Sequence, residues 1–149
     1  MKQLSHNKKL IHFVAIVLLL LATWLVERYT NTDSDPVDSN YSALQTAIEN
    51  QQSDIQVEGS GIIIKVLPDD THGSKHQRLL IKLDNGHTIL IAHNIDLAPR
   101  VKNPKEGNAI DFYGEFEWNN KGGVVHWTHH DPGNRHPDGW LKYQGKIYQ

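Results

Sequence analysis

The chain has no cysteine among its 149 residues, and this absence limits how the protein can be held together. Disulfides and thiolate metal sites are excluded, so a folded domain must rely on its hydrophobic core. An ion could help only if nitrogen or oxygen ligands hold it. Lipid modification of an N-terminal cysteine is excluded for the same reason.

A strong excess of either charge is also missing, since the formal net charge is −2 and the pI is about 6.5. Nucleic-acid-binding domains usually carry a basic face, which this balance does not predict. Tyr113, Trp118 and Trp127 could stack on bases, but Glu115 and Glu117 share the strand of Tyr113. We therefore expect no nucleic-acid partner.

The common signatures of catalysis are absent as well. There is no Gly-x-Ser-x-Gly elbow, no cysteine nucleophile and no His-Glu-x-x-His zinc motif. A metal-dependent hydrolase, such as a phosphodiesterase or nuclease, remains an alternative that would need clustered carboxylates, an ion and an arginine. Asp69, Asp70, Asp96 and Arg100 could supply them, although their spacing does not demand it. A non-catalytic binding or interaction module is the favoured interpretation.

One long apolar run, Leu10–Val26, stands out near the N-terminus. Its length is at the short end of the roughly 17–25 residues that span a bilayer as a helix. Lys2, Lys8 and Lys9 precede it, which predicts a cytoplasmic N-terminus and an outward-facing remainder. An uncleaved signal anchor is favoured over a cleaved signal peptide because bulky Trp24 interrupts any small-x-small cleavage site.

The chain divides by pattern into three parts. Residues 1–28 are expected to form a cytoplasmic tip and the transmembrane helix, and residues 29–54 a polar linker with a short helix over Tyr41–Gln51. Residues 55–149 change to a period of two, which is typical of half-buried strands. The strands expected there are Ile55–Leu67, Gln77–Leu83, His87–His93, Ile110–Trp118 and Val124–Thr128, with a small hairpin over Leu141–Tyr148.

These elements predict a mainly β fold, namely a small OB-like β-barrel of five or six strands after one transmembrane helix and a short helix. Gly59 and Gly61 predict a bend in the first strand. The segment Glu106–Glu115 resembles the glycine-strand-glycine entry to a late strand of oligonucleotide/oligosaccharide-binding barrels.

The most informative segment runs from His126 to Trp140 and is rich in histidine. Imidazole and carboxylate groups bind zinc and other divalent transition metals, usually three or four to an ion. On a straight strand His126 and His129 would point to opposite faces, so they could share an ion only if the strand ended near Thr128. Alternatively, the histidines only hydrogen-bond within an ordinary turn-rich loop. The candidate metal ligands are His126, His129, His130, Asp131, His136 and Asp138, of which a subset would serve.

A second set of polar and aromatic residues could bind an organic ligand. Polar residues end the apolar strand before Asn94, and Arg100 could clamp a carboxylate or phosphate, or pair with Asp96 instead. An Asx-turn at Asn94 and Asp96 is the competing structural interpretation. The candidate ligand-binding residues are His93, Asp96, Arg100, Trp127, Arg135 and Trp140.

Three longer motifs are HNIDLAPR at residues 93–100, WNNKGGVVHWTH at 118–129 and HPDGW at 136–140. Together they resemble a small bacterial membrane-anchored envelope family classed as a domain of unknown function, over about Gly59–Gln149. The resemblance implies a bacterial inner-membrane protein with its domain in the periplasm, or a periplasmic protein if the N-terminal segment is cleaved. Expected partners are the membrane, through a single N-terminal anchor, and an unknown envelope ligand or protein. The family carries no catalytic residues to transfer.

Overall fold

A computed structural model describes residues 16–23 and 36–149, which belong to two compact units, Met1–Ser34 and Asp35–Gln149. In the first unit residues 16–23 are helical, and the apolar side chains from Ile16 to Leu21 are exposed. Within the described ranges, every helix falls short of the length and apolarity that a membrane crossing requires. The predicted span Leu10–Val26 lies partly outside these ranges and stays a prediction.

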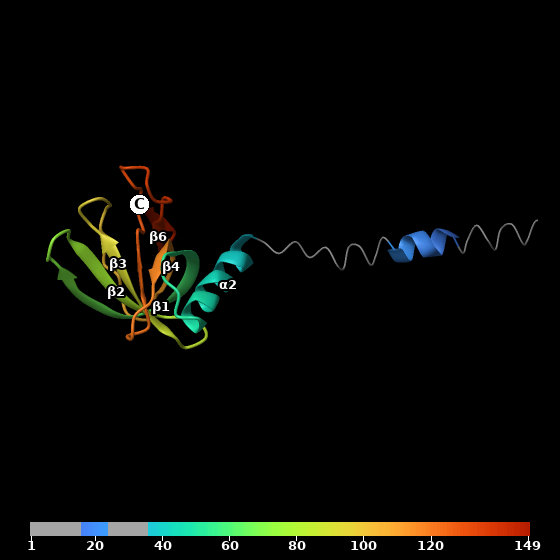
Figure 1. Ribbon diagram of the computed structural model, residues 1–149, viewed down its shortest axis with the longest axis horizontal. Helices are drawn as coiled ribbons and strands as arrows, with labels where there is room; N and C mark the ends of the chain where they lie inside the picture. The colour runs from blue at the N-terminus through green and yellow to red at the C-terminus, as the bar shows by residue number, and fades with distance from the viewer. Residues whose placement is uncertain (1–15, 24–35) are drawn as a thin grey trace, which may run out of the picture. The chain divides into compact units, whose positions relative to one another are not determined.

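The second unit contains one helix and seven strands in the part of the chain that is described (Figure 1). Helix α2 covers Pro36–Glu49, and the long first strand β1 covers Ile55–Asp70. The remaining strands are β2 (His76–Lys82), β3 (Thr88–Asn94), β4 (Ala109–Glu117), β5 (Val124–His126), β6 (Trp140–Tyr143) and β7 (Lys146–Tyr148).

Strand β1 is long enough to pair with two different neighbours. Its first half, Ile55–Ile62, pairs with β4, and its second half pairs with β2 as far as Asp70. Since β2 pairs with β3, β3 pairs in parallel with β5, and β5 pairs with β4, the order β1-β2-β3-β5-β4 returns to its start. The last two strands extend the sheet from β4 through β6 to β7.

Alternation along the strands separates a core from an outer face. Most inward-facing residues of β1 to β6 are buried. In β4, for example, Ile110, Phe112, Gly114 and Phe116 are buried and alternate with half-exposed residues. Helix α2 adds Leu44 and Ala47 to the same core and packs beside β1 (Figure 1). The outer face of β4 therefore carries Asp111, Tyr113, Glu115 and Glu117.

The mainly β class is confirmed, and several predicted details are wrong. Among the described residues there are seven strands instead of five or six, because the C-terminal hairpin contributes two. Strand β1 continues to Asp70 rather than ending at Leu67. The helix begins at Pro36 rather than Tyr41, since proline suits the first helical position. Strand β5 ends at His126 rather than Thr128 because Trp127 adopts a left-handed conformation with φ 53°.

A buried histidine ties two loops to the sheet. His93 is 0% exposed, with Nδ1 at 2.8 Å from the Thr128 hydroxyl oxygen and Nε2 at 3.2 Å from the Pro99 carbonyl oxygen. Burial lowers the pKa of His93 to about 4, because the charged imidazolium loses its hydration there. His93, predicted as a ligand-binding residue, is thus placed in the interior.

Acid should destabilise the domain through this residue. The folded pKa of about 4 lies below the usual unfolded pKa, so the stabilisation is complete above about pH 6.5 and is lost as pH falls toward 4. At pH 5 the loss is about 2 kcal/mol from His93 alone. Urea unfolding at pH 7 and pH 5 should show a smaller difference for His93→Gln than for wild type. An identical pH difference in both proteins would contradict this assignment.

Candidate metal centre

The loop after β5 is organised by Asp131. Its carboxylate accepts hydrogen bonds from the backbone N–H groups of Gly133, Arg135 and His136, at 2.8, 2.6 and 3.0 Å. These bonds lower the pKa of Asp131 to about 2. A carboxylate used in this way shapes the loop, and its oxygens are already satisfied by the backbone.

Other members of the histidine-rich segment also bond within the loop. The 3% exposed His129 donates Nδ1–H to the His130 carbonyl oxygen at 2.6 Å, and His130 Nδ1 lies 2.9 Å from an oxygen of Asp138. The other oxygen of Asp138 accepts the backbone N–H of Asp131, and this bond is the main cause of the lowered pKa of Asp138. Much of the segment therefore forms the turn network that was one of its two predicted roles.

The side chains of two histidines make no hydrogen bond within this loop and instead lie beside a glutamate on the outer face of the sheet. His126 Nε2 is 3.5 Å from Oε1 of Glu115, and His136 Nδ1 is 3.5 Å from Oε2 of the same residue. His126 Nε2 is also 4.0 Å from Oε1 of Glu117. One ligand atom from each of Glu115, Glu117 and His126 lies within 4.8 Å of the others. We call these three residues the metal cluster.

The local fold explains why these residues meet. Glu115 and Glu117 follow the outward alternation of β4, and Glu115 pairs in register with His126 on β5. The left-handed conformation at Trp127 then turns the chain, and the Trp127 ring stacks on His136 at 3.9 Å between ring centroids. This stack holds the imidazole of His136 beside Glu115.

Two buried nitrogens flank Glu115 without any hydrogen-bond partner. They are His126 Nε2 and Gln56 Nε2. Among the described residues, every other buried side-chain nitrogen or oxygen has a hydrogen-bond partner. Gln56 pairs with Glu115 from the β1 side, so both atoms belong to one row across three strands. Buried polar atoms in native proteins nearly always have a partner, so water or a bound group beside Glu115 could satisfy these two nitrogens.

Burial also affects the protonation of His126. Desolvation is the largest cause of its lowered pKa, and the nearby carboxylates of Glu115 and Glu117 oppose that effect. A neutral imidazole has a free lone pair on one nitrogen and is the form that binds metals.

The other predicted ligand-binding residues do not gather at this place. Asp96 accepts the backbone N–H of Lys75 at 2.8 Å, whereas Arg100 forms its ion pair with Asp69 rather than Asp96. Arg135 belongs to the Asp131 loop. Trp127 contacts His136, and Trp140 stacks against Tyr113 one row away from the metal cluster.

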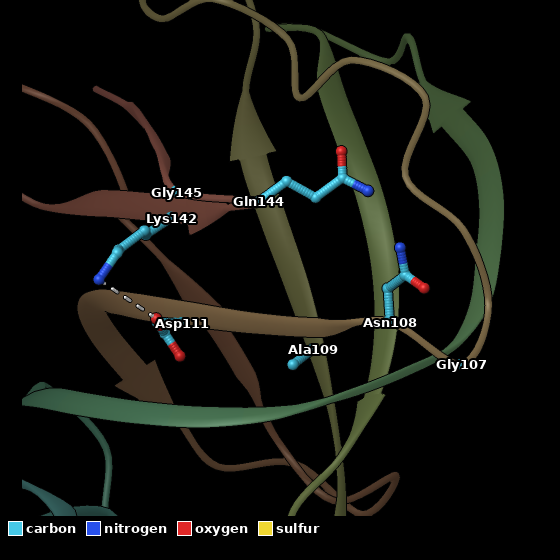
Figure 2. A pocket seen from close by; sticks show the side chains of 7 residues that line it. All are labelled: Gly107, Asn108, Ala109, Asp111, Lys142, Gln144 and Gly145. Atoms are coloured by element: carbon cyan, nitrogen blue, oxygen red, sulfur yellow. Dashed lines mark ion pairs between the residues drawn. The ribbon is translucent and has the colours of Figure 1, made fainter.

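A separate shallow pocket of about 450 Å³ opens where β4 begins and β6 turns into β7 (Figure 2). Asp111 and Lys142 face each other there at 3.9 Å, and the amides of Asn108 and Gln144 lie nearby (Figure 2). None of the predicted site residues or the metal cluster lines this pocket, and it contains no histidine.

Glu115 and Glu117 were not among the predicted ligands, because alternating acidic residues on a strand are typical of a solvated face. The hairpin between β4 and β5 is the sequence signal that could have identified Glu115 as a partner of His126. Counting back across the Asn119–Gly123 turn pairs Glu115 with His126, which places a carboxylate opposite an imidazole.

The chain belongs to the family Protein of unknown function (DUF3465), whose model matches residues 26–149. This match confirms the resemblance to a family classed as a domain of unknown function. No curated protein and no solved structure matches the chain.

Proposed function

We propose that the Asp35–Gln149 unit is a metal-binding module in which His126, Glu115 and Glu117 hold one divalent transition metal ion, such as zinc. The supporting observation is the separation of 3.5 Å between His126 Nε2 and Glu115 Oε1. Two atoms bonded to one tetrahedral zinc at about 2.0–2.1 Å are about 3.4 Å apart. The pair makes no hydrogen bond, yet its spacing is that of two ligands of one ion.

The chemistry of the donors favours zinc or a similar ion over calcium or magnesium. One imidazole nitrogen with carboxylate oxygens suits borderline ions, whereas hard ions prefer oxygen ligands alone. Two carboxylates neutralise a doubly charged ion. His136, beside the second oxygen of Glu115, is in position to orient that carboxylate by a hydrogen bond, as partners of metal ligands commonly do.

Binding without catalysis is favoured over a hydrolase. Phosphoryl transfer is commonly assisted by a further positive group near the phosphate, such as an arginine, a lysine or a second metal ion. Within residues 36–149, the titratable side chains beside Glu115 and Glu117 are histidines alone, and Arg100 is paired with Asp69.

The module is proposed to face the periplasm from a single N-terminal anchor in the inner membrane. The lysines before Leu10 and the exposed apolar side chains from Ile16 to Leu21 support this location. The cycle β1-β2-β3-β5-β4, with its parallel β3–β5 pair, supports an OB-like barrel as its fold. An envelope ligand or protein is the expected partner.

A matched pair of variants tests the metal proposal. Glu117→Gln removes one anionic ligand without changing shape and is expected to weaken zinc binding at least about tenfold, since even outer-shell partners of a metal matter that much. Glu58→Gln removes the same charge from the outer face of β1, outside the metal cluster, and should leave zinc binding unchanged. Isothermal titration with zinc chloride measures both. Equal weakening by the two variants would mean general attraction to an acidic surface and would contradict the proposal.

A further inference from the structure

A second row of side chains crosses the outer face next to the metal cluster. Glu58 on β1 pairs in register with Tyr113 on β4, and Tyr113 pairs with Trp140 on β6. All three side chains are half-buried on the outward side. Tyr113 is two residues before Glu115 on the same face of β4, so this row adjoins the metal cluster without including it. We call Glu58, Tyr113 and Trp140 the aromatic row.

The aromatic row offers polar groups that the domain itself does not use. The Tyr113 and Trp140 rings stack with centroids 6.3 Å apart and planes 25° apart. Within the part of the chain that is described, the Glu58 carboxylate, the Tyr113 hydroxyl and the Trp140 indole N–H have no hydrogen bond or ion pair. None of these groups is among the fully buried atoms without a partner, so each is accessible to a ligand that approaches from solvent.

Negative charge dominates the surroundings of the row. Asp111 and Glu115 flank Tyr113 along β4, and the nearby cation Lys142 is 3.9 Å from Asp111. A cation next to aromatic rings is attracted by their negative faces, and a neighbouring carboxylate adds to that attraction. A polyanion such as nucleic acid would instead be repelled.

We propose that the aromatic row binds the guanidinium group of an arginine side chain presented by a partner protein. Guanidinium is planar, so it can stack on a tyrosine or tryptophan ring while it donates two parallel hydrogen bonds to a carboxylate. The row provides both elements, a ring pair and the unpaired Glu58. An ammonium group is a strongly hydrated point charge without a flat face, so lysine would satisfy only the charge. A neutral sugar could stack on the rings and donate a hydroxyl to Glu58, but it has no positive charge to match the negative surroundings of the row.

The test uses peptide probes on the full chain stripped of metal with chelator, so it does not depend on zinc binding. Acetyl-triarginine amide, the trilysine equivalent and the neutral isostere tricitrulline are titrated while tryptophan fluorescence and heat are recorded. Triarginine is expected to bind at least about tenfold more tightly than tricitrulline and several-fold more tightly than trilysine, since only arginine has both charge and a flat face. Glu58→Gln should weaken the triarginine complex about fivefold, as expected for loss of one partly buried charged hydrogen bond.

Two further variants keep the result decisive. Trp140→Leu removes one ring from the row and should weaken triarginine binding as Glu58→Gln does, while far-UV circular dichroism verifies that the fold is retained. Glu106→Gln removes an exposed charge from a loop outside the row and should leave binding unchanged. The proposal is overturned if tricitrulline or trilysine binds as tightly as triarginine, or if Glu106→Gln weakens binding as much as Glu58→Gln. Because no metal is present, these outcomes are separate from success or failure of the zinc site.

Discussion

A His126→Ala variant is expected to lose zinc affinity by about a hundredfold or more, because it removes the nitrogen ligand of the metal cluster. The same change should leave the metal-free protein as stable as wild type, or slightly more stable. His126 Nε2 is buried without a hydrogen-bond partner, so removing it relieves a desolvation penalty rather than breaking a bond. A residue that lowers the stability of the metal-free protein but raises its affinity for the ion is typical of a functional position.

The comparison variant is His130→Ala. His130 belongs to the same segment and pairs with Asp138 in the loop, outside the metal cluster. Zinc titration and thermal unfolding with and without zinc should separate the two changes, with the zinc-dependent rise in melting temperature lost in His126→Ala and kept in His130→Ala. The reverse result would place the ion in the loop, among the other ligands predicted from the sequence.

A Gly139→Ala variant is expected to lose about 3 kcal/mol of folding stability, the upper end of what overpacking usually costs. A Cβ at this position would collide with the Trp127 carbonyl oxygen and would lie 2.6 Å from the Tyr113 carbonyl oxygen. Both obstacles are backbone atoms of the sheet and its adjoining turn, so no side chain can move to make room. The loop must shift outward, which should also displace His136 from Glu115 and weaken zinc binding.

Gly133→Ala in the same loop is the matched control for Gly139→Ala. Its added Cβ would approach Arg135 Nε at 2.9 Å, at the far end of a flexible side chain that can move aside. The expected cost is below about 1 kcal/mol. Urea unfolding of both variants measures the difference. A loss for Gly139→Ala as small as that expected for Gly133→Ala would show that the loop tolerates outward movement at Gly139 and would refute the close-approach argument.

The strands could be predicted from sequence because their alternation reflects one buried and one exposed face. Ile110, Phe112 and Phe116 alternate with polar residues, and the structure buries all three. The early end of β5 could not be predicted in this way. A left-handed tryptophan is rare, and its conformation at Trp127 depends on the stack with His136 and on the loop that Asp131 organises.

The sequence pattern identified one of the three members of the metal cluster, His126. His136, which lies beside Glu115, was also a predicted ligand, but all the predicted ligands belong to the histidine-rich segment. Glu115 and Glu117 come from the preceding strand, and only cross-strand register brings Glu115 opposite His126. Asp131 was also a predicted ligand, yet its oxygens are satisfied by three backbone N–H groups.

The most direct test is anomalous X-ray scattering at the zinc edge from crystals grown with equimolar zinc. The proposed site predicts one strong anomalous peak. The peak should lie about 2.0–2.2 Å from His126 Nε2 and from one oxygen of each of Glu115 and Glu117. A peak beside His130 and Asp138, or the absence of any peak at His126, would contradict the central claim.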